Sequence, residues 1–342
     1  MKAVCLKAPF TVCIEEVPIP ERKPGEALLK ILSASLCGSD VNAYRGGGKK
    51  FSYPSVIGHE VVAEVAGIDD GRPFKKGDRV LINPYVYCGK CYPCSLGHTN
   101  CCESLQVLGC GAAKGAMSEF FVHPDHLLVP LPDSIDLLTA PLAEPLAIAL
   151  HGLHQAGIGQ SMPTKIEYAV IIGAGSIGLL AAMACRHFGV APILIDILDS
   201  RLSYAASLGF TYTINSASRD AVQAISEITN GVMAKAVLEM SGATAAIQST
   251  LSYASYCGTI AYTGWPSSMT TLDTSLITLK ELTLKGARTA TSELAEAVTL
   301  IEEHKIDVSP ILTRTVTLEE IPAALKALSD HPEEYLKITA LF

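Results

Sequence analysis

The feature that most constrains the fold is a glycine-rich turn between two apolar stretches in the second half of the chain. Residues 168–172 form an uninterrupted apolar run, residues 173–178 read Gly-Ala-Gly-Ser-Ile-Gly, and residues 179–188 have the composition of a helix. A second apolar run, residues 192–195, ends in Asp196. Glycines at this spacing let the backbone approach a pyrophosphate, the helix start favours its charge, and the acid accepts hydrogen bonds from ribose hydroxyls. We therefore predict a dinucleotide site, and NAD rather than NADP because Asp196 would repel a 2′-phosphate.

Hydropathy alone would suggest a membrane span in the same region. Residues 168–185 carry no charged side chain and approach transmembrane length. Three glycines within six residues favour instead a buried strand, a turn and a buried helix. Residues 1–10 show no long apolar run followed by a small-residue cleavage site, so we expect a cytoplasmic protein with no membrane partner.

Length and charge set two further limits. At 342 residues the chain exceeds the size of a single core, which predicts two domains. The formal charge of −8 argues against a nucleic-acid partner, because neutralising phosphates needs a basic patch.

The two halves of the chain differ in the secondary structure that their sequences predict. Residues 1–34 read as short strands without helices, whereas strands and helices alternate through residues 211–263, which predicts a parallel α/β sheet there. Ligands bind such sheets where the strands end. The candidate cofactor-binding residues are Gly173, Gly175, Ser176, Ile177, Gly178, Asp196, Arg201, Ser241, Thr263 and Gly264.

Cysteines cluster in one short lobe. Cys88, Cys91, Cys94 and Cys102 lie within fifteen positions, and eleven cysteines in a cytoplasmic chain indicate metal or free thiols rather than disulfides. Four thiolates at this spacing favour a closed structural zinc site. An iron–sulfur cluster or an empty thiol loop are the alternatives, and Cys101 leaves the register open by one residue.

A second metal site is predicted around Gly58-His59-Glu60. Alone, a His-Glu pair is usually solvated surface, but Cys37 opens a short helix about twenty residues earlier. Imidazole, thiolate and carboxylate are zinc ligands, and a catalytic zinc takes about three of them and leaves a position open. We expect Asp40 to accept a hydrogen bond from the His59 ring.

Glu144 competes with Glu60 for the carboxylate position. It precedes a proline in the largely apolar stretch 137–158, where an unpaired charge would be penalised. A proline at that point suits the first turn of a helix, and a helix-start acid is the alternative. The candidate catalytic-zinc ligands are Cys37, His59, Glu60 and Glu144, and which carboxylate binds directly is left open.

Together these motifs resemble those of a known family. Cys37-Gly-Ser-Asp40, Gly58-His-Glu60, Lys76-Gly-Asp-Arg-Val80, the cysteine lobe, Glu144-Pro145 and residues 173–178 look, in order, like the zinc-dependent medium-chain alcohol and polyol dehydrogenases. The resemblance implies a GroES-like β-rich catalytic domain, residues 1–147 and 288–342, and a Rossmann doubly wound parallel-sheet domain, residues 148–287. It also implies two zinc ions per chain, NAD, and a homodimer or homotetramer, with the strand at residues 282–286 as a subunit edge.

Within the family, Glu144-Pro145 resembles the sorbitol and polyol branch. Three further stretches look most like enzymes that oxidise sugar acids at C5, such as L-galactonate and L-gulonate 5-dehydrogenases: residues 47–54, 99–103 and 285–289. The resemblance implies transfer of a hydride from a secondary alcohol of a sugar acid or polyol to NAD, with Ser39 accepting the proton.

Other functions stay open on the sequence. Galactitol-phosphate dehydrogenases are also similar, and an aldehyde reductase or an NAD-binding structural or sensing protein could use the same scaffold. Arg45, Lys49 and Arg288 are candidates to hold a carboxylate or phosphate of the substrate, with surface charge as the alternative. Many relatives carry a proton-relay histidine where this chain has Asn42, which cannot titrate.

Overall fold

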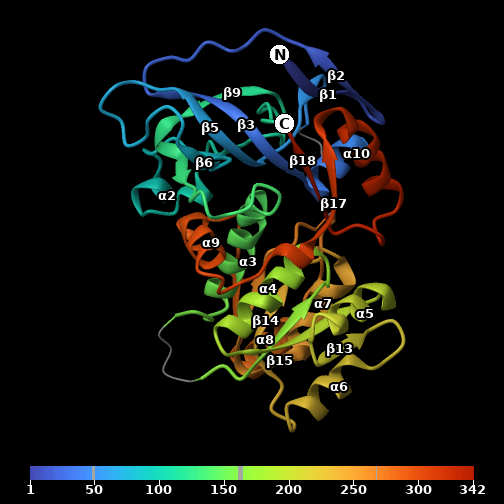
Figure 1. Cartoon of the computed structure of the whole chain (residues 1–342). Helices are drawn as coiled ribbons and strands as arrows, with labels where there is room; N and C mark the ends of the chain where they lie inside the picture. The colour runs from blue at the N-terminus through green and yellow to red at the C-terminus, as the bar shows by residue number, and fades with distance from the viewer. Residues whose placement is uncertain (48–50, 161–164, 267) are drawn as a thin grey trace. The chain divides into compact units, whose positions relative to one another are not determined.

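The computed structural model describes residues 1–47, 51–160, 165–266 and 268–342. The chain divides into two compact units (Figure 1). The first unit comprises Met1–Glu144, Leu294–His304 and Val308–Phe342, and the second comprises Pro145–Glu293 with Lys305–Asp307. The second unit is thus an insertion in the first, whereas the sequence had suggested the boundaries 148 and 287.

The second unit is built on one parallel sheet of six strands in the order β13-β12-β11-β14-β15-β16. The strands are β11 (Tyr168–Ile172), β12 (Ala191–Asp196), β13 (Tyr212–Asn215), β14 (Ala234–Glu239), β15 (Ala254–Tyr262) and β16 (Thr283–Gly286). Helices α4 (Ser176–His187), α5 (Asp199–Ser207), α6 (Ala221–Ile228), α7 (Thr244–Tyr253) and α8 (Thr274–Lys280) connect them. The order reverses between β11 and β14, as in doubly wound dinucleotide-binding sheets.

Burial explains why the middle strands read as continuous apolar runs. Four of the five residues of β11 are buried, because helices cover both faces of a parallel sheet. Helix α4 buries eight consecutive residues, from Gly178 to Cys185, against the sheet. The uncharged run at residues 168–185 is therefore a strand, a turn and a helix, and among the described residues no helix is long and apolar enough to cross a bilayer.

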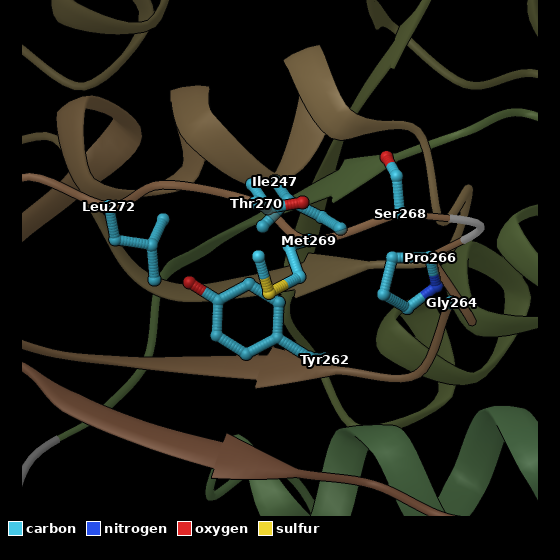
Figure 2. A pocket seen from close by; sticks show the side chains of 8 residues that line it. All are labelled: Ile247, Tyr262, Gly264, Pro266, Ser268, Met269, Thr270 and Leu272. Carbon is cyan, nitrogen blue, oxygen red and sulfur yellow. The ribbon is translucent and has the colours of Figure 1, made fainter.

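A pocket of about 610 Å³ opens beside the carboxyl end of β15 (Figure 2). Its lining is mostly apolar and comes from α7, β15 and the loop that follows β15: Ile247, Tyr262, Gly264, Pro266, Ser268, Met269, Thr270 and Leu272. Figure 2 shows the ring of Tyr262 next to the side chain of Met269. The pocket lies wholly within the second unit.

The first unit is β-rich. Its largest sheet has the order β10-β6-β5-β3-β18-β17, with β9 also pairing with β3, and a three-stranded sheet has the order β2-β1-β4. The strands are β1 (Lys2–Ala8), β2 (Thr11–Glu16), β3 (Glu26–Leu36), β4 (Ser55–Val56), β5 (Glu60–Gly67), β6 (Arg79–Ile82), β7 (Tyr85–Val86), β8 (Gln106–Val107), β9 (Phe120–Pro124), β10 (Leu128–Pro130), β17 (Leu312–Thr317) and β18 (Lys337–Leu341). Among the described residues, the remaining α-helices are α1 (Gly38–Tyr44), α2 (Tyr92–Ser95), α3 (Ala143–Gln155), α9 (Glu293–Glu302) and α10 (Ile321–Asp330). Helix α3 begins in this unit and ends in the other, and the first residue of α9 belongs to the other unit.

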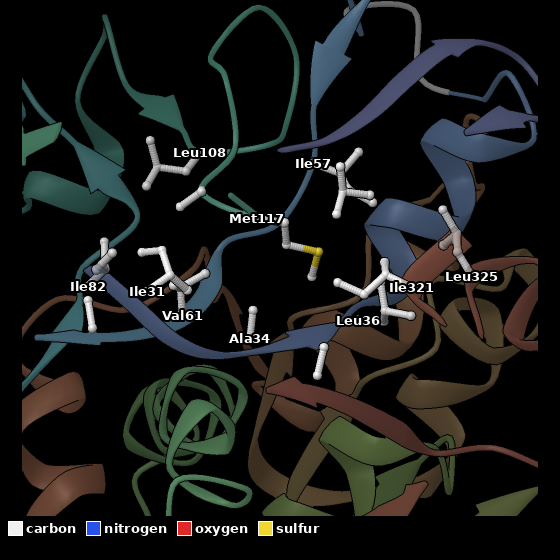
Figure 3. Packing of buried hydrophobic residues seen from close by; sticks show 14 of the residues in the cluster. Ile31, Ala34, Leu36, Ile57, Val61, Ile82, Leu108, Met117, Ile321 and Leu325 are labelled. Atoms are coloured by element: carbon white, nitrogen blue, oxygen red, sulfur yellow. The ribbon is translucent and has the colours of Figure 1, made fainter. Parts of the chain in front are cut away.

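The core of the first unit joins the two ends of the chain. Met117 projects among Ile57, Leu36 and Ile321 in Figure 3, so residues from β3, the segment before β5 and α10 meet around one side chain. All four side chains are essentially buried. Because β18 pairs with β3 and α10 packs in this core, the C-terminal segment completes a domain that the N-terminal segment begins.

The predicted α/β class, with a β-rich domain and a doubly wound parallel-sheet domain, is confirmed. Several elements had no counterpart in the sequence interpretation, among them β9, β17 and α8. The strand expected at residues 282–286 is β16, an edge strand of the six-stranded sheet. Strand β17 alternates exposed and buried residues and carries threonines and an arginine, so its apolar signal is weak.

Candidate active site and metal centres

Two turns bring a thiol and an imidazole together. Cys37 is the N-cap of α1, and His59 stands between Gly58 and the first residue of β5. Gly58 has φ +97°, and a Cβ there would lie 2.4 Å from the Met117 side chain, so only glycine fits this turn. The ligand atoms of Cys37, His59 and Glu60 lie within 4.8 Å of one another.

The Asp40 carboxylate links these two turns through hydrogen bonds. It is fully buried and accepts hydrogen bonds from the backbone N–H of Cys37 at 2.9 Å and of Gly58 at 3.2 Å. The predicted hydrogen bond from the His59 ring to Asp40 is wrong for this structure, because Nδ1 of His59 has no hydrogen-bond partner among the described residues. The carboxylate is used instead to position the backbone around the site.

The immediate surroundings of His59 are acidic. Burial alone would lower the pKa of His59, but the side chains of Cys37, Cys110 and Asp40 raise that pKa well above its usual value. Ser39 Oγ lies 3.5 Å from His59 Nε2. Cys110, which the sequence analysis did not single out, therefore lies close to the site.

Glu60 is held by a cation that the sequence did not point to. One carboxylate oxygen pairs with Nζ of Lys337 in β18, and the other accepts a hydrogen bond from Ser35 in β3. Glu60 and Lys337 are 1% and 2% exposed, so this is a buried ion pair. Burial opposes the charge, but Cys37, Glu60 and Glu144 raise the pKa of Lys337. A lysine in an otherwise apolar terminal strand was the only signal available.

Glu144 presents one unsatisfied oxygen. It lies in the first turn of α3, is 1% exposed, and shares a hydrogen bond through Oε1 with the hydroxyl of Tyr85 in β7. Its Oε2 is buried with no hydrogen-bond partner in the described part of the chain. Burial raises the pKa of Glu144, against the opposing effect of His59. Glu144 is not one of the three residues whose ligand atoms lie within 4.8 Å of one another.

The cysteine lobe gathers four thiols. The Sγ atoms of Cys88, Cys91, Cys94 and Cys102 lie within 4.8 Å of one another, with Cys91 at 3.4 Å from Cys94 and 3.8 Å from Cys102. A tetrahedral zinc with bonds of about 2.3 Å separates its sulfurs by about 3.8 Å. Backbone N–H groups of Lys90 and Cys91 lower the pKa of Cys88 to about 6, which favours the thiolate that binds metal. The neighbouring Cys101 is exposed and lies outside this set.

In the second unit, the glycine-rich turn has little room for side chains. Gly173 has φ +102°, and a Cβ on Gly178 would lie 1.8 Å from the carbonyl oxygen of Gly173. Gly175 is the N-cap of α4, and a Cβ there would meet no atom within 4 Å. The turn therefore combines a tight bend, an open approach and close contact between helix and strand, as a pyrophosphate-binding turn requires.

Asp196 ends β12 next to this turn. It is 7% exposed and accepts hydrogen bonds from the N–H groups of Ala174 at 2.7 Å, Ile197 at 2.8 Å and Leu198 at 3.0 Å. Arg201 Nη1 lies 3.7 Å from Asp196 Oδ2. The carboxylate is thus oriented by the backbone of the glycine turn and of its own loop.

Two family models match this sequence, and its curated relatives include two that align with most or all of the chain. Residues 23–133 match the alcohol dehydrogenase GroES-like domain, and residues 176–303 match the zinc-binding dehydrogenase family. An uncharacterized zinc-type alcohol dehydrogenase-like protein of Haemophilus influenzae is 48% identical over 100% of this chain and 99% of that protein. The L-galactonate-5-dehydrogenase of Escherichia coli K12 is 32% identical over 87% of this chain and 86% of that enzyme. This chain belongs to the zinc-dependent medium-chain alcohol and polyol dehydrogenases.

A solved structure agrees with this assignment. A protein of Escherichia coli CFT073, described as a short chain alcohol dehydrogenase and complexed with NADH, superimposes with a TM-score of 0.91 at 27% identity. The match covers 100% of this chain and 99% of that chain. The dehydrogenase described here is accordingly an NAD-dependent oxidoreductase of the zinc family.

The donor atoms of this dehydrogenase fit zinc. A thiol, an imidazole and a carboxylate within 4.8 Å are zinc's preferred ligands, and four thiols form the second set. The unsatisfied Oε2 of Glu144 is the kind of buried acceptor that a nearby cation would satisfy. We propose Cys37 and His59 as ligands of the catalytic ion, with Glu60 or Glu144 as the carboxylate.

The three substrate candidates of the dehydrogenase have different outcomes. Arg45 bonds through Nε to Ser329 Oγ at 2.9 Å and through Nη2 to the Ser329 carbonyl, so its guanidinium fastens α1 to α10 and the predicted substrate role is not supported. Lys49 lies outside the described residues. Arg288 is partly buried and stays a prediction.

Proposed function

We propose that this dehydrogenase oxidises a secondary alcohol of a sugar acid or polyol with NAD, with a hexonate oxidised at C5 as the closest substrate class. The observation that carries the proposal is the Cys37, His59 and Glu60 ligand set. Glu144, whose second oxygen is unsatisfied and whose pKa is raised by burial and influenced by His59 and Glu60, supplies a further carboxylate near it. The similarity to L-galactonate-5-dehydrogenase over 87% of the chain supports the same substrate class.

The protein residues have distinct roles in this proposal. Zinc, when bound, supplies a positive charge that lowers the pKa of an alcohol hydroxyl. Ser39 accepts the hydroxyl proton, since its Oγ already lies at the edge of the site, 3.5 Å from His59 Nε2. Asp40 keeps the Cys37 and Gly58 turns at a fixed separation. NAD, when bound, would supply the hydride acceptor, and the glycine turn and Asp196 would hold its diphosphate and adenosine ribose.

The proton leaves by a route without a second titrating side chain. Asn42 stands where many relatives have a histidine, and it is exposed. We propose that the proton passes from Ser39 to water or to the hydroxyls of the substrate itself. The ribose of NAD, when bound, would supply further hydroxyls for the same role. A substrate with several hydroxyls suits this route better than a simple alcohol.

A substrate panel tests the proposal. The zinc content of the purified protein is measured first. The protein is then assayed for NAD reduction with L-galactonate, L-gulonate, sorbitol, galactitol 1-phosphate, a hydroxylated amino acid, ethanol and an aromatic alcohol. The same assays are repeated with NADP in place of NAD. We expect the highest kcat/KM with a hexonate or polyol and NAD. If the protein holds two zinc ions per chain yet acts on no polyol, aldonate or sugar phosphate, the proposed substrate class is wrong. The assignment of the chain to the dehydrogenase family would not be affected.

A further inference from the structure

Glu239 is a buried carboxylate to which the sequence motifs assign no role. It ends β14, is fully buried, and accepts hydrogen bonds from the N–H of Ser241 at 2.8 Å, the N–H of Gly242 at 2.9 Å and the hydroxyl of Ser241. All three partners are donors, which suits an ionised carboxylate because that form only accepts. The side chain thus fixes the turn that follows β14.

The main chain of the same residue fixes a second turn. The carbonyl of Glu239 accepts hydrogen bonds from the N–H of Thr263 at 2.9 Å and of Gly264 at 3.0 Å, just after β15. One residue therefore holds the turns at the carboxyl ends of two neighbouring strands.

The two turns pack so closely that both need glycine. A Cβ on Gly264 would lie 2.5 Å from Oε2 of Glu239 and 2.2 Å from the nitrogen of Gly242. Gly242 has φ +70°, and a Cβ there would lie 2.6 Å from the carbonyl oxygen of Trp265. The position of each turn consequently depends on where the Glu239 carboxylate lies.

These turns belong to the half of the sheet that faces the nicotinamide. In a sheet with this strand order, the two mononucleotide halves of the cofactor lie on either side of the switch between β11 and β14. Asp196 marks the adenosine half, on β12, so β14 and β15 support the other half. At the end of β15, Thr263 has a buried hydroxyl with no hydrogen-bond partner within the described chain.

We propose that Glu239 is the positioning residue of the nicotinamide half of the NAD site. Its carboxylate and its carbonyl together set the spacing between the Ser241–Gly242 turn and the Thr263–Gly264 turn. Glu239 need not touch the cofactor, because it acts through the backbone of these turns. The inference rests on NAD use and not on the identity of the alcohol substrate.

The test measures cofactor binding directly. Glu239→Gln keeps the shape of the side chain but replaces one acceptor by an NH₂ donor facing backbone N–H groups. We expect the Kd for NADH, followed by its fluorescence, and the KM for NAD to rise about tenfold. The KM for the alcohol at saturating NAD and the zinc content should change less than twofold. A general loss of structure would not weaken cofactor binding while leaving these two quantities unchanged.

A matched control comes from the same unit. Asp273 is exposed and accepts from the N–H and hydroxyl of Ser275, the same pattern that Glu239 makes with Ser241. Asp273→Asn should leave the Kd for NADH within twofold of the parent value. If Glu239→Gln does not fold, Glu239→Asp replaces it: this variant keeps the charge but withdraws the carboxylate from the Gly242 N–H, and the same selective loss is expected. A folded Glu239 variant that binds NADH as the parent does, or one that loses cofactor and alcohol affinity equally, overturns the proposal.

Discussion

At the scale of single residues, the site depends on charges buried in pairs. Glu60 and Lys337 neutralise each other inside the first unit, and Asp40 is satisfied by two backbone N–H groups. A buried charge left without its partner costs several kcal/mol, whereas an exposed pair contributes little. The stability of the first unit and the state of its metal site are therefore linked through the same side chains.

Replacing Lys337 tests that link. Lys337→Met should lower the free energy of unfolding by about 3–5 kcal/mol, because it leaves the Glu60 carboxylate buried without a cation. Urea denaturation of the purified variant measures this. Lys326→Met is the control, since it removes only an exposed pair with Asp330 and should leave the free energy of unfolding nearly unchanged. Equal effects of the two substitutions would contradict the assignment.

A buried histidine predicts a pH dependence. His123 in β9 shares a hydrogen bond with the Asn83 carbonyl, and burial lowers the pKa of His123 to about 4. The folded-state pKa lies below the unfolded value of about 6.5, so the unfolded chain binds more protons between these values. The contribution of His123 to the free energy of unfolding is therefore complete above pH 6.5 and should fall by about 3 kcal/mol as the pH drops to 4. The urea midpoint of His123→Gln, which cannot titrate, should fall less over this range than that of the parent, and parallel curves would exclude the effect.

Sequence separation decides which site residues could be predicted. The four cysteines of the lobe are at most fourteen positions apart, and short loops keep such residues close whatever the rest of the chain does. Lys337 lies 277 positions from Glu60, and no local pattern connects the two. Tyr85 was missed for a similar reason: a tyrosine in a short strand has no spacing signature, and its partner Glu144 lies 59 positions away.

At the scale of elements, the fold was predictable where periodicity was strong. Apolar strands followed by glycine turns marked the parallel sheet of the second unit. Strand β9 has partly buried residues, and helix α8 has no buried ones, so neither carried a clear apolar pattern. Strand β9 is instead specified by tertiary context, through its register on β3. Helix α8 is marked only by a local signal, its Asp273 cap, which the sequence analysis did not use.

The two cysteine sites should respond differently to substitution. Cys91→Ser removes a ligand of the structural lobe and should lower both the zinc content and the melting temperature. Cys37→Ser should abolish turnover with the melting temperature little changed, because α1 keeps its Asp40 bonds. Cys101→Ser, at an exposed cysteine outside the cluster, is the control. Loss of activity at unchanged stability in both Cys91→Ser and Cys37→Ser would show that the two roles have been assigned wrongly.

At the scale of the whole molecule, metal and cofactor chemistry belong to different compact units. The metal-ligand candidates belong to the first unit, and the glycine turn, Asp196 and Glu239 belong to the second. Each unit has its own core, so each can keep its binding function when the other is perturbed.

Chelation tests this independence. Removing zinc with a strong chelator should eliminate NAD reduction, while the Kd for NADH stays within about threefold, because the cofactor-binding residues are not metal ligands. Fluorescence titration of the chelated protein gives the Kd, and adding zinc back should restore turnover. Loss of NADH binding together with the metal would show that the cofactor site depends on the first unit.

The insertion of the second unit has a consequence for synthesis on the ribosome. Strand β18 pairs with β3 and carries Lys337, yet it is translated only after the entire second unit. The second unit can close its parallel sheet from residues that are nearly continuous in the chain. Until β18 has been synthesised, the first unit lacks Lys337, the ion-pair partner of Glu60, and one edge of β3 lacks its neighbouring strand. The nascent chain therefore acquires a folded nucleotide domain before it has a finished metal site, and agents that bind exposed strand edges should act on it during that interval.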